Sequence, residues 1–69
     1  MSYTVTLSIP NISCRHCIMT IARETRELPG VIRVEGDVEA KAVTFTLEDE
    51  RSLAGVKRTL VEIGYPATN

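Results

Sequence analysis

Two cysteines separated by two residues are the part of this sequence best suited to chemistry. They stand in the segment Cys14-Arg15-His16-Cys17, and the chain has no other cysteine and a single histidine. A disulfide across so short a loop removes little entropy from the unfolded chain, so a structural disulfide explains the pair poorly. A four-cysteine zinc site needs a second ligand pair, which the sequence lacks. A redox dithiol and a two-thiolate metal site remain, beside the plain alternative of two cysteines buried in a core.

The residues around this motif predict a strand, a loop and a helix. Residues 3–9 alternate apolar and polar side chains, which is typical of a half-buried strand, and Pro10 with Asn11 ends it. We expect Ser13 to cap a helix whose inward face carries Ile18, Ile21, Ala22, Thr25 and Leu28. The cysteines are therefore expected in the loop and the first helical turn, where the helix dipole and the charge of Arg15 favour thiolates.

The middle of the chain predicts two strands joined by a polar turn. The first strand covers residues 31–35, and the second, residues 42–47, alternates cleanly, with Val43, Phe45 and Leu47 on one face. The turn is expected near residues 39–41. Gly36 is expected to weaken the end of the first strand or to mark a bulge.

The last third of the chain predicts a second helix and a short edge strand. Residues 48–52 supply cap residues and acidic first-turn residues, and the apolar stripe is Leu53, Val56, Leu60 and Ile63. Gly64 ends the helix, and residues 65–68 form the last strand. The order strand, helix, strand, strand, helix, strand predicts a ferredoxin-like α+β sandwich, with a four-stranded antiparallel sheet and two helices on one face.

Length and charge exclude several classes of protein. A chain of 69 residues has room for one domain, residues 1–69, with one thin core, so a deep substrate pocket is not expected. The formal net charge of −1 argues against nucleic acid as the main partner. No stretch approaches the roughly 18 apolar residues of a membrane span, and the first residues do not form a secretory signal. We therefore expect a cytoplasmic protein without membrane insertion.

The chain resembles the heavy-metal-associated domain, the small fold of copper chaperones and of N-terminal modules in metal-pumping P-type ATPases. The family's Met-x-Cys-x-x-Cys motif appears here as Ile12-Ser13-Cys14-Arg15-His16-Cys17. Further landmarks at the family's spacings are Pro29-Gly30-Val31, the hairpin pairs Val38-Glu39 and Val43-Thr44, and Gly64-Tyr65. The resemblance covers nearly the whole chain.

This resemblance implies a non-enzymatic metallochaperone that carries a soft metal ion, most often Cu(I), on Cys14 and Cys17. The partner would be a metal-transporting P-type ATPase or its metal-binding domain, which receives the ion by thiolate exchange. A two-sulfur site leaves the ion open to attack by a partner's thiols. Such an open site is compatible with a monomer or a metal-bridged dimer.

Three alternatives to a copper carrier remain. The same two thiolates serve a carrier of Zn(II), Cd(II) or Hg(II), although a periplasmic mercury scavenger is not expected without a signal sequence. In a thiol–disulfide redox protein, Cys14 would be the nucleophile and Cys17 the resolving thiol. The chain could also be a metal-sensing module of a larger ATPase or reductase, but a free-standing protein is the simpler expectation.

Four residues near the cysteines are candidates for a supporting role: His16, Tyr65, Ser13 and Ile12. Ile12 stands where the family has methionine and keeps an apolar volume under the loop. His16 is either a third ligand, which would favour zinc, or a solvent-facing residue of the first helical turn. The resemblance places Tyr65 close to the metal loop, and the alternative is an aromatic side chain that closes the end of the core.

One stripe of the first helix carries Arg15, Met19, Arg23 and Arg26. These side chains could meet an acidic patch on a partner and speed docking. Glu24 and Glu27 interleave with them, so an ordinary solvated helix face is the other interpretation.

Overall fold

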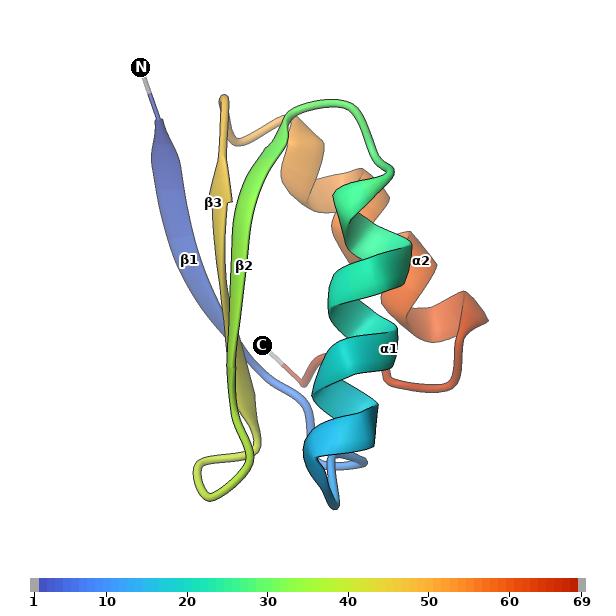
Figure 1. Cartoon of the computed structure of the whole chain (residues 1–69). Helices are drawn as coiled ribbons and strands as arrows, with labels where there is room; N and C mark the ends of the chain where they lie inside the picture. Colours follow the sequence, from blue (N-terminus) through green and yellow to red (C-terminus); the bar gives the residue numbers. More distant parts are fainter. Residues whose placement is uncertain (1, 69) are drawn as a thin grey trace.

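The computed structural model describes residues 2–68 and contains three strands and two helices. In chain order these are β1 (Tyr3–Ser8), α1 (Arg15–Arg26), β2 (Val31–Asp37), β3 (Ala42–Leu47) and α2 (Ser52–Glu62). The strands are antiparallel in the order β1-β3-β2, and both helices cover the same face of the sheet (Figure 1). Within residues 2–68, no helix is long and apolar enough to cross a membrane.

The core lies between the sheet and the two helices. Val43, Phe45 and Leu47 of the central strand β3 are buried, which confirms the face that the alternation predicted. Helix α1 contributes Ile21 and Thr25, both fully buried. The Thr25 hydroxyl donates a hydrogen bond of 2.7 Å to the Ile21 carbonyl, so this polar group is satisfied inside the core.

The predicted fourth strand is not formed in the described part of the chain. Residues 65–68 have no strand conformation, although the Thr68 N–H donates a hydrogen bond of 2.9 Å to the Ser8 carbonyl of β1. Pro66 has no N–H to donate, which removes one rung of a ladder from an already short segment. The sheet of the described residues therefore has three strands.

The expected role of Gly36 as a bulge is wrong. The register shift between β2 and β3 lies between Val31 and Arg33, whereas Gly36 pairs regularly with Val43. A Cβ at Gly36 would overlap the side chain of Ile18, which reaches across from α1. This glycine makes room for a helix instead of interrupting a strand.

Both helices begin differently from the prediction. Cys14, not Ser13, is the N-cap of α1, and neither helix has a side-chain cap. Helix α2 has no acidic residue in its first turn, because the acidic residues lie in the preceding turn, where Asp49 Oδ1 accepts the Arg51 N–H at 2.8 Å. The prediction that Gly64 ends the second helix is confirmed, since this residue has a positive φ of 87° that an L side chain rarely adopts.

Candidate metal site

The loop between β1 and α1 and the first turn of α1 hold the cysteines at one end of the molecule (Figure 1). Ile9 and Ile12 are fully buried and fix the loop to the core from below. The Ile12 N–H donates to the Ile9 carbonyl at 3.1 Å, which closes a tight turn between the two anchors. Ile12 therefore occupies the packing position expected under the loop, and the residues after it are raised to the surface.

The two cysteines lie in different environments. Both are free thiols, Cys14 is exposed, and Cys17 is 7% exposed. Cys14 has extended backbone angles (φ −158°, ψ 175°) at the start of α1, and its carbonyl accepts the Cys17 N–H at 3.1 Å. The predicted placement in the loop and first helical turn is correct. One sulfur is open to solvent, and the other is fixed at the inner edge of the loop.

Hydrogen bonds lower the pKa of Cys17 from 9.0 to about 6. The largest effect comes from the Tyr65 hydroxyl, followed by the backbone N–H groups of Ser13 and Cys14 and the hydroxyl of Ser13, whereas burial acts in the opposite direction. The Ser13 Oγ lies 3.7 Å from the Cys17 Sγ, so the Ser13 hydroxyl hydrogen bonds to this sulfur and does not cap the helix. Cys17 is therefore a thiolate at neutral pH, the form that binds metals.

The same hydrogen bond acts on Tyr65 in return. The hydrogen bond to the Cys17 sulfur is the main cause that raises the pKa of the Tyr65 phenol, because the neutral phenol is the donor. Burial adds to the rise. The Tyr65 hydroxyl thus keeps its proton at neutral pH, where Cys17 is already ionised. The structure contains both interpretations of Tyr65 from sequence, since its hydroxyl bonds to a sulfur and its side chain packs against the core.

The end of helix α2 holds Tyr65 in position. The left-handed conformation of Gly64 turns the chain back, and the Tyr65 N–H donates to the Leu60 carbonyl at 2.7 Å. From the opposite side, the Asn11 side-chain amide donates to the Gly64 carbonyl at 3.0 Å. Asn11 therefore ties the cysteine loop to the segment that carries Tyr65. In the sequence it indicates only a turn, because a contact across 53 positions leaves no local signal.

His16 does not join the cysteines in a cluster of metal ligands within residues 2–68. His16 is exposed, and no group of three or more His, Cys, Asp or Glu side chains in residues 2–68 is placed to hold a metal ion. Met19, Arg23 and Arg26 line a shallow groove on α1 with Ala22, whereas Arg15 lines a different one.

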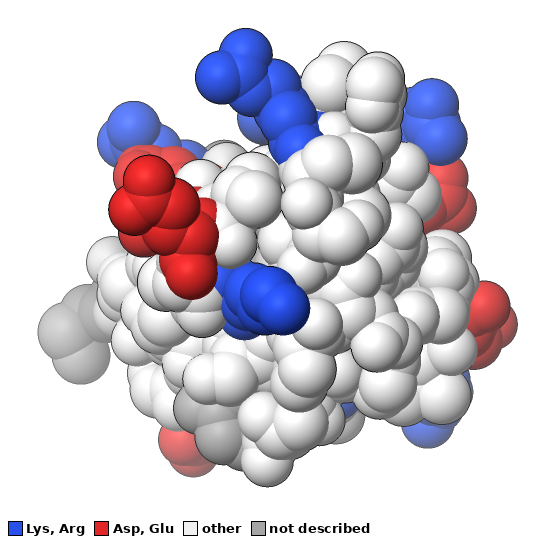
Figure 2. Space-filling view, turned by 90° about the horizontal axis from the view of Figure 1, so that it is seen from below, with Lys and Arg blue, Asp and Glu red and all other residues white. Residues whose placement is uncertain are grey.

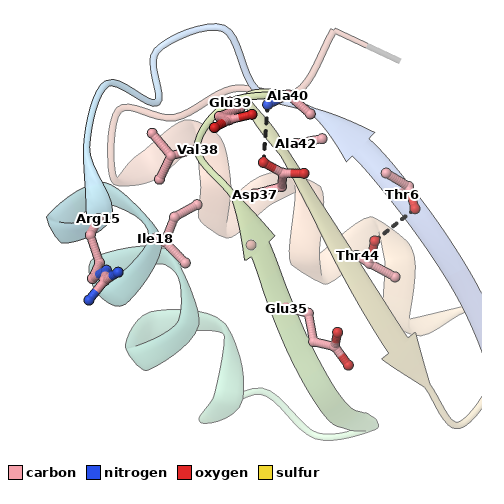
Figure 3. Close-up of a pocket in the computed structure, with 11 residues that line it drawn as sticks. Thr6, Arg15, Ile18, Glu35, Asp37, Val38, Glu39, Ala40, Ala42 and Thr44 are labelled. Atoms are coloured by element: carbon pink, nitrogen blue, oxygen red, sulfur yellow. Dashed lines mark hydrogen bonds between the residues drawn. The ribbon is translucent and has the colours of Figure 1, made fainter.

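The groove beside Arg15 is open and has a volume of about 680 Å³. It lies between the start of α1 and the β2–β3 hairpin, and neither cysteine lines it (Figure 3). Seen from the loop end, a broad uncharged surface is bordered by side chains of both signs (Figure 2). The cysteine loop therefore lies at the surface beside this groove, with charges of both signs nearby.

We predict that Tyr65→Phe raises the pKa of Cys17 from about 6 towards 9.0, because the hydroxyl provides the strongest stabilisation of the thiolate. Thiolate absorbance measured against pH in the reduced, metal-free protein gives this value. The folded state favours the thiolate, so the contribution of Cys17 to the free energy of unfolding should rise as the pH increases from about 6 to 9.0 and stay level outside that window. This rise should be smaller in Tyr65→Phe.

Tyr3→Phe is the matched control, since Tyr3 lies on β1 and removal of its hydroxyl should leave the titration of Cys17 unchanged. An unaltered Cys17 titration in Tyr65→Phe would show that the Tyr65 hydroxyl does not stabilise the thiolate.

Comparison with known proteins assigns the family. Residues 6–66 match the family model of the heavy-metal-associated domain. A mercuric transport protein periplasmic component of Pseudomonas aeruginosa is 30% identical over 66 residues, which cover 94% of this chain and 72% of the relative.

Solved structures agree with this match. A heavy metal binding protein of Thermotoga maritima is 39% identical, with a TM-score of 0.77 and coverage of 100% of this chain and 94% of that one. A proposed copper-ion-binding protein of Bacillus anthracis is 25% identical, with a TM-score of 0.88 and coverage of 99% and 97%. By their names these relatives bind or transport metals, and none is named as an enzyme. The chain belongs to the heavy-metal-associated domain family.

Proposed function

We propose that this protein is a cytoplasmic metallochaperone that binds one Cu(I) ion between Cys14 and Cys17. The observation that carries the proposal is the pairing of an exposed thiol with a stabilised thiolate at the start of α1. Thiolates are the ligands that soft ions prefer, and a helix start adds N–H groups that favour negative charge. The two sulfurs can bind such an ion without a pocket.

The ligand count favours Cu(I) over Zn(II). Zinc in proteins is almost always four-coordinate, and residues 2–68 bring together no group of three or more candidate side chains. Two thiolates would leave zinc with half of its shell to be filled by water or by another molecule. Cu(I) suits a site made of soft sulfur ligands alone. A Zn(II) or Cd(II) carrier is therefore the weaker proposal.

The difference between the two cysteines supports an order of transfer. A thiolate from the partner first binds the ion from the solvent side, and the bond to Cys14 breaks because this sulfur is exposed. A second partner thiolate then replaces Cys17, which is buried and therefore less accessible to attack from solvent. Each step forms one metal–sulfur bond and breaks one, with no change of oxidation state. A metal-transporting P-type ATPase, or its metal-binding domain, is the proposed partner.

A competition titration tests the proposal. Under anaerobic, reducing conditions the protein should take Cu(I) from a chromophoric chelator at a ratio of one ion per chain and should leave Zn(II) with its chelator. Cys14→Ser and Cys17→Ser should each abolish the competition, because a single thiolate cannot hold the ion. His16→Ala is the matched control between the two cysteines, and its affinity for Cu(I) should equal that of the wild type.

Two results would contradict this proposal. Competition that survives replacement of both cysteines would place the ion elsewhere. Loss of affinity in His16→Ala would make His16 a third ligand and would turn the preference towards zinc.

A carrier of Hg(II) is the second candidate function, and the similarity to a mercuric transport protein favours it. Hg(II) also binds thiolates, so affinity in solution separates the two metals poorly. Deletion of the gene in its host separates them better. A copper carrier predicts altered tolerance of copper with unchanged tolerance of mercury, and the reverse result would favour Hg(II). Complementation with the Cys14→Ser variant, which should fail, ties either phenotype to the site.

A further inference from the structure

Gly36 lies on β2 directly beneath the first turn of α1. A Cβ atom at this position would fall 2.9 Å from Cγ1 of Ile18 and closer still to its Cγ2 and Cδ1. Real Cβ atoms essentially never approach other heavy atoms this closely. Figure 3 shows Ile18 directed from α1 towards β2. The glycine therefore allows the helix to pack against the backbone of the strand.

Space, and not backbone conformation, is what this position requires. Gly30 and Gly64 have positive φ angles, which explains a glycine at each of them, but Gly36 does not. It sits in regular register opposite Val43, where any L residue could adopt the backbone angles. The close approach of Ile18 is thus the feature that separates Gly36 from the other glycines.

Ile18 has little freedom to move aside. It is β-branched, and β-branched side chains on a helix are largely confined to one χ1 rotamer. All three atoms beyond its Cβ would clash with an alanine methyl group at position 36, so rotation of the terminal methyl alone brings no relief. A methyl group at Gly36 would therefore push α1 and β2 apart at this level of the helix.

The residue that would move first is the metal ligand, because Cys17 immediately precedes Ile18 in the first turn of α1. The Cys17 sulfur depends on hydrogen bonds from Tyr65 and from the loop, which are attached to other parts of the fold. Hydrogen bonds weaken steeply with loss of distance and alignment. A small displacement of the turn would thus separate the sulfur from its donors.

We infer that Gly36 is a positioning residue of the metal site: by leaving Ile18 in contact with the β2 backbone, it sets the depth at which the first turn of α1 presents Cys17. This inference rests on the proposed role of Cys14 and Cys17 as ligands of a soft ion. It assigns no contact between Gly36 and the ion.

Gly36→Ala tests the inference by two measurements. The affinity for Cu(I) should fall about tenfold, in line with the loss of residues that support metal ligands. In the metal-free protein, the amide resonances of Cys17 and Tyr65 should shift. Gly55→Ala is the matched control, since no heavy atom lies within 4 Å of its added Cβ. It should leave both measurements unchanged, whereas a purely general effect of replacing a glycine would alter both variants alike.

Removal of the clash provides the rescue. In an Ile18→Ala background, adding Gly36→Ala should change the Cu(I) affinity by less than about twofold, because coupling between contacting residues disappears once the contact is gone. If Gly36→Ala alone does not fold, the double variant must fold and must bind Cu(I) as Ile18→Ala does. A double variant that stays unfolded, or that loses a further tenfold or so in affinity, would overturn the inference.

Failure of the inference differs from failure of the proposed function. Absence of Cu(I) binding by the wild type would refute the function and leave the amide shifts as the test of Gly36. Cu(I) binding by the wild type together with unchanged affinity and unchanged amide shifts in Gly36→Ala would refute the inference alone.

Discussion

The hydrogen bond between the Tyr65 hydroxyl and the Cys17 sulfur joins the segment after α2 to the first turn of α1. It is the main reason that Cys17 ionises near pH 6, and an ionised sulfur is the condition for binding a soft ion. The geometry of this bond depends on the left-handed turn at Gly64 and on the Asn11 amide that fastens the loop to it. Parts of the chain that are distant in sequence thus act together to stabilise the ionised Cys17 sulfur.

A small core is sufficient for this arrangement. Phe45 and its neighbours on β3 support both helices from one face, and the buried Ile9 and Ile12 anchor the loop from below. In the proposed function, a soft ion needs only two sulfurs at a rigid helix start and open space above them, which favours rapid exchange with a partner over permanent enclosure. A chain with one thin core can provide this, and a deep pocket would slow the release of the ion.

Local patterns predicted most of the fold and the position of the cysteines. The alternation along β3 and the helical spacing of the apolar residues in α1 and α2 identify these elements because each depends on neighbours in sequence. The predicted fourth strand is not formed because Pro66 has no N–H group to donate to a neighbouring strand. The bulge expected at Gly36 was wrong because a glycine in a strand has the same appearance in sequence whether it forms a bulge or makes room for Ile18 from a helix. The link from Asn11 to Gly64 is a long-range contact of the folded chain and has no sequence signature.

The central claim is that Cys14 and Cys17 alone bind the ion in an open, two-sulfur site. X-ray absorption at the copper edge of the Cu(I)-loaded protein, prepared without other thiols, tests it most directly. We expect two sulfur atoms and no nitrogen or oxygen in the first coordination shell. A shell that contains an imidazole nitrogen, or only one sulfur per copper, would contradict the claim.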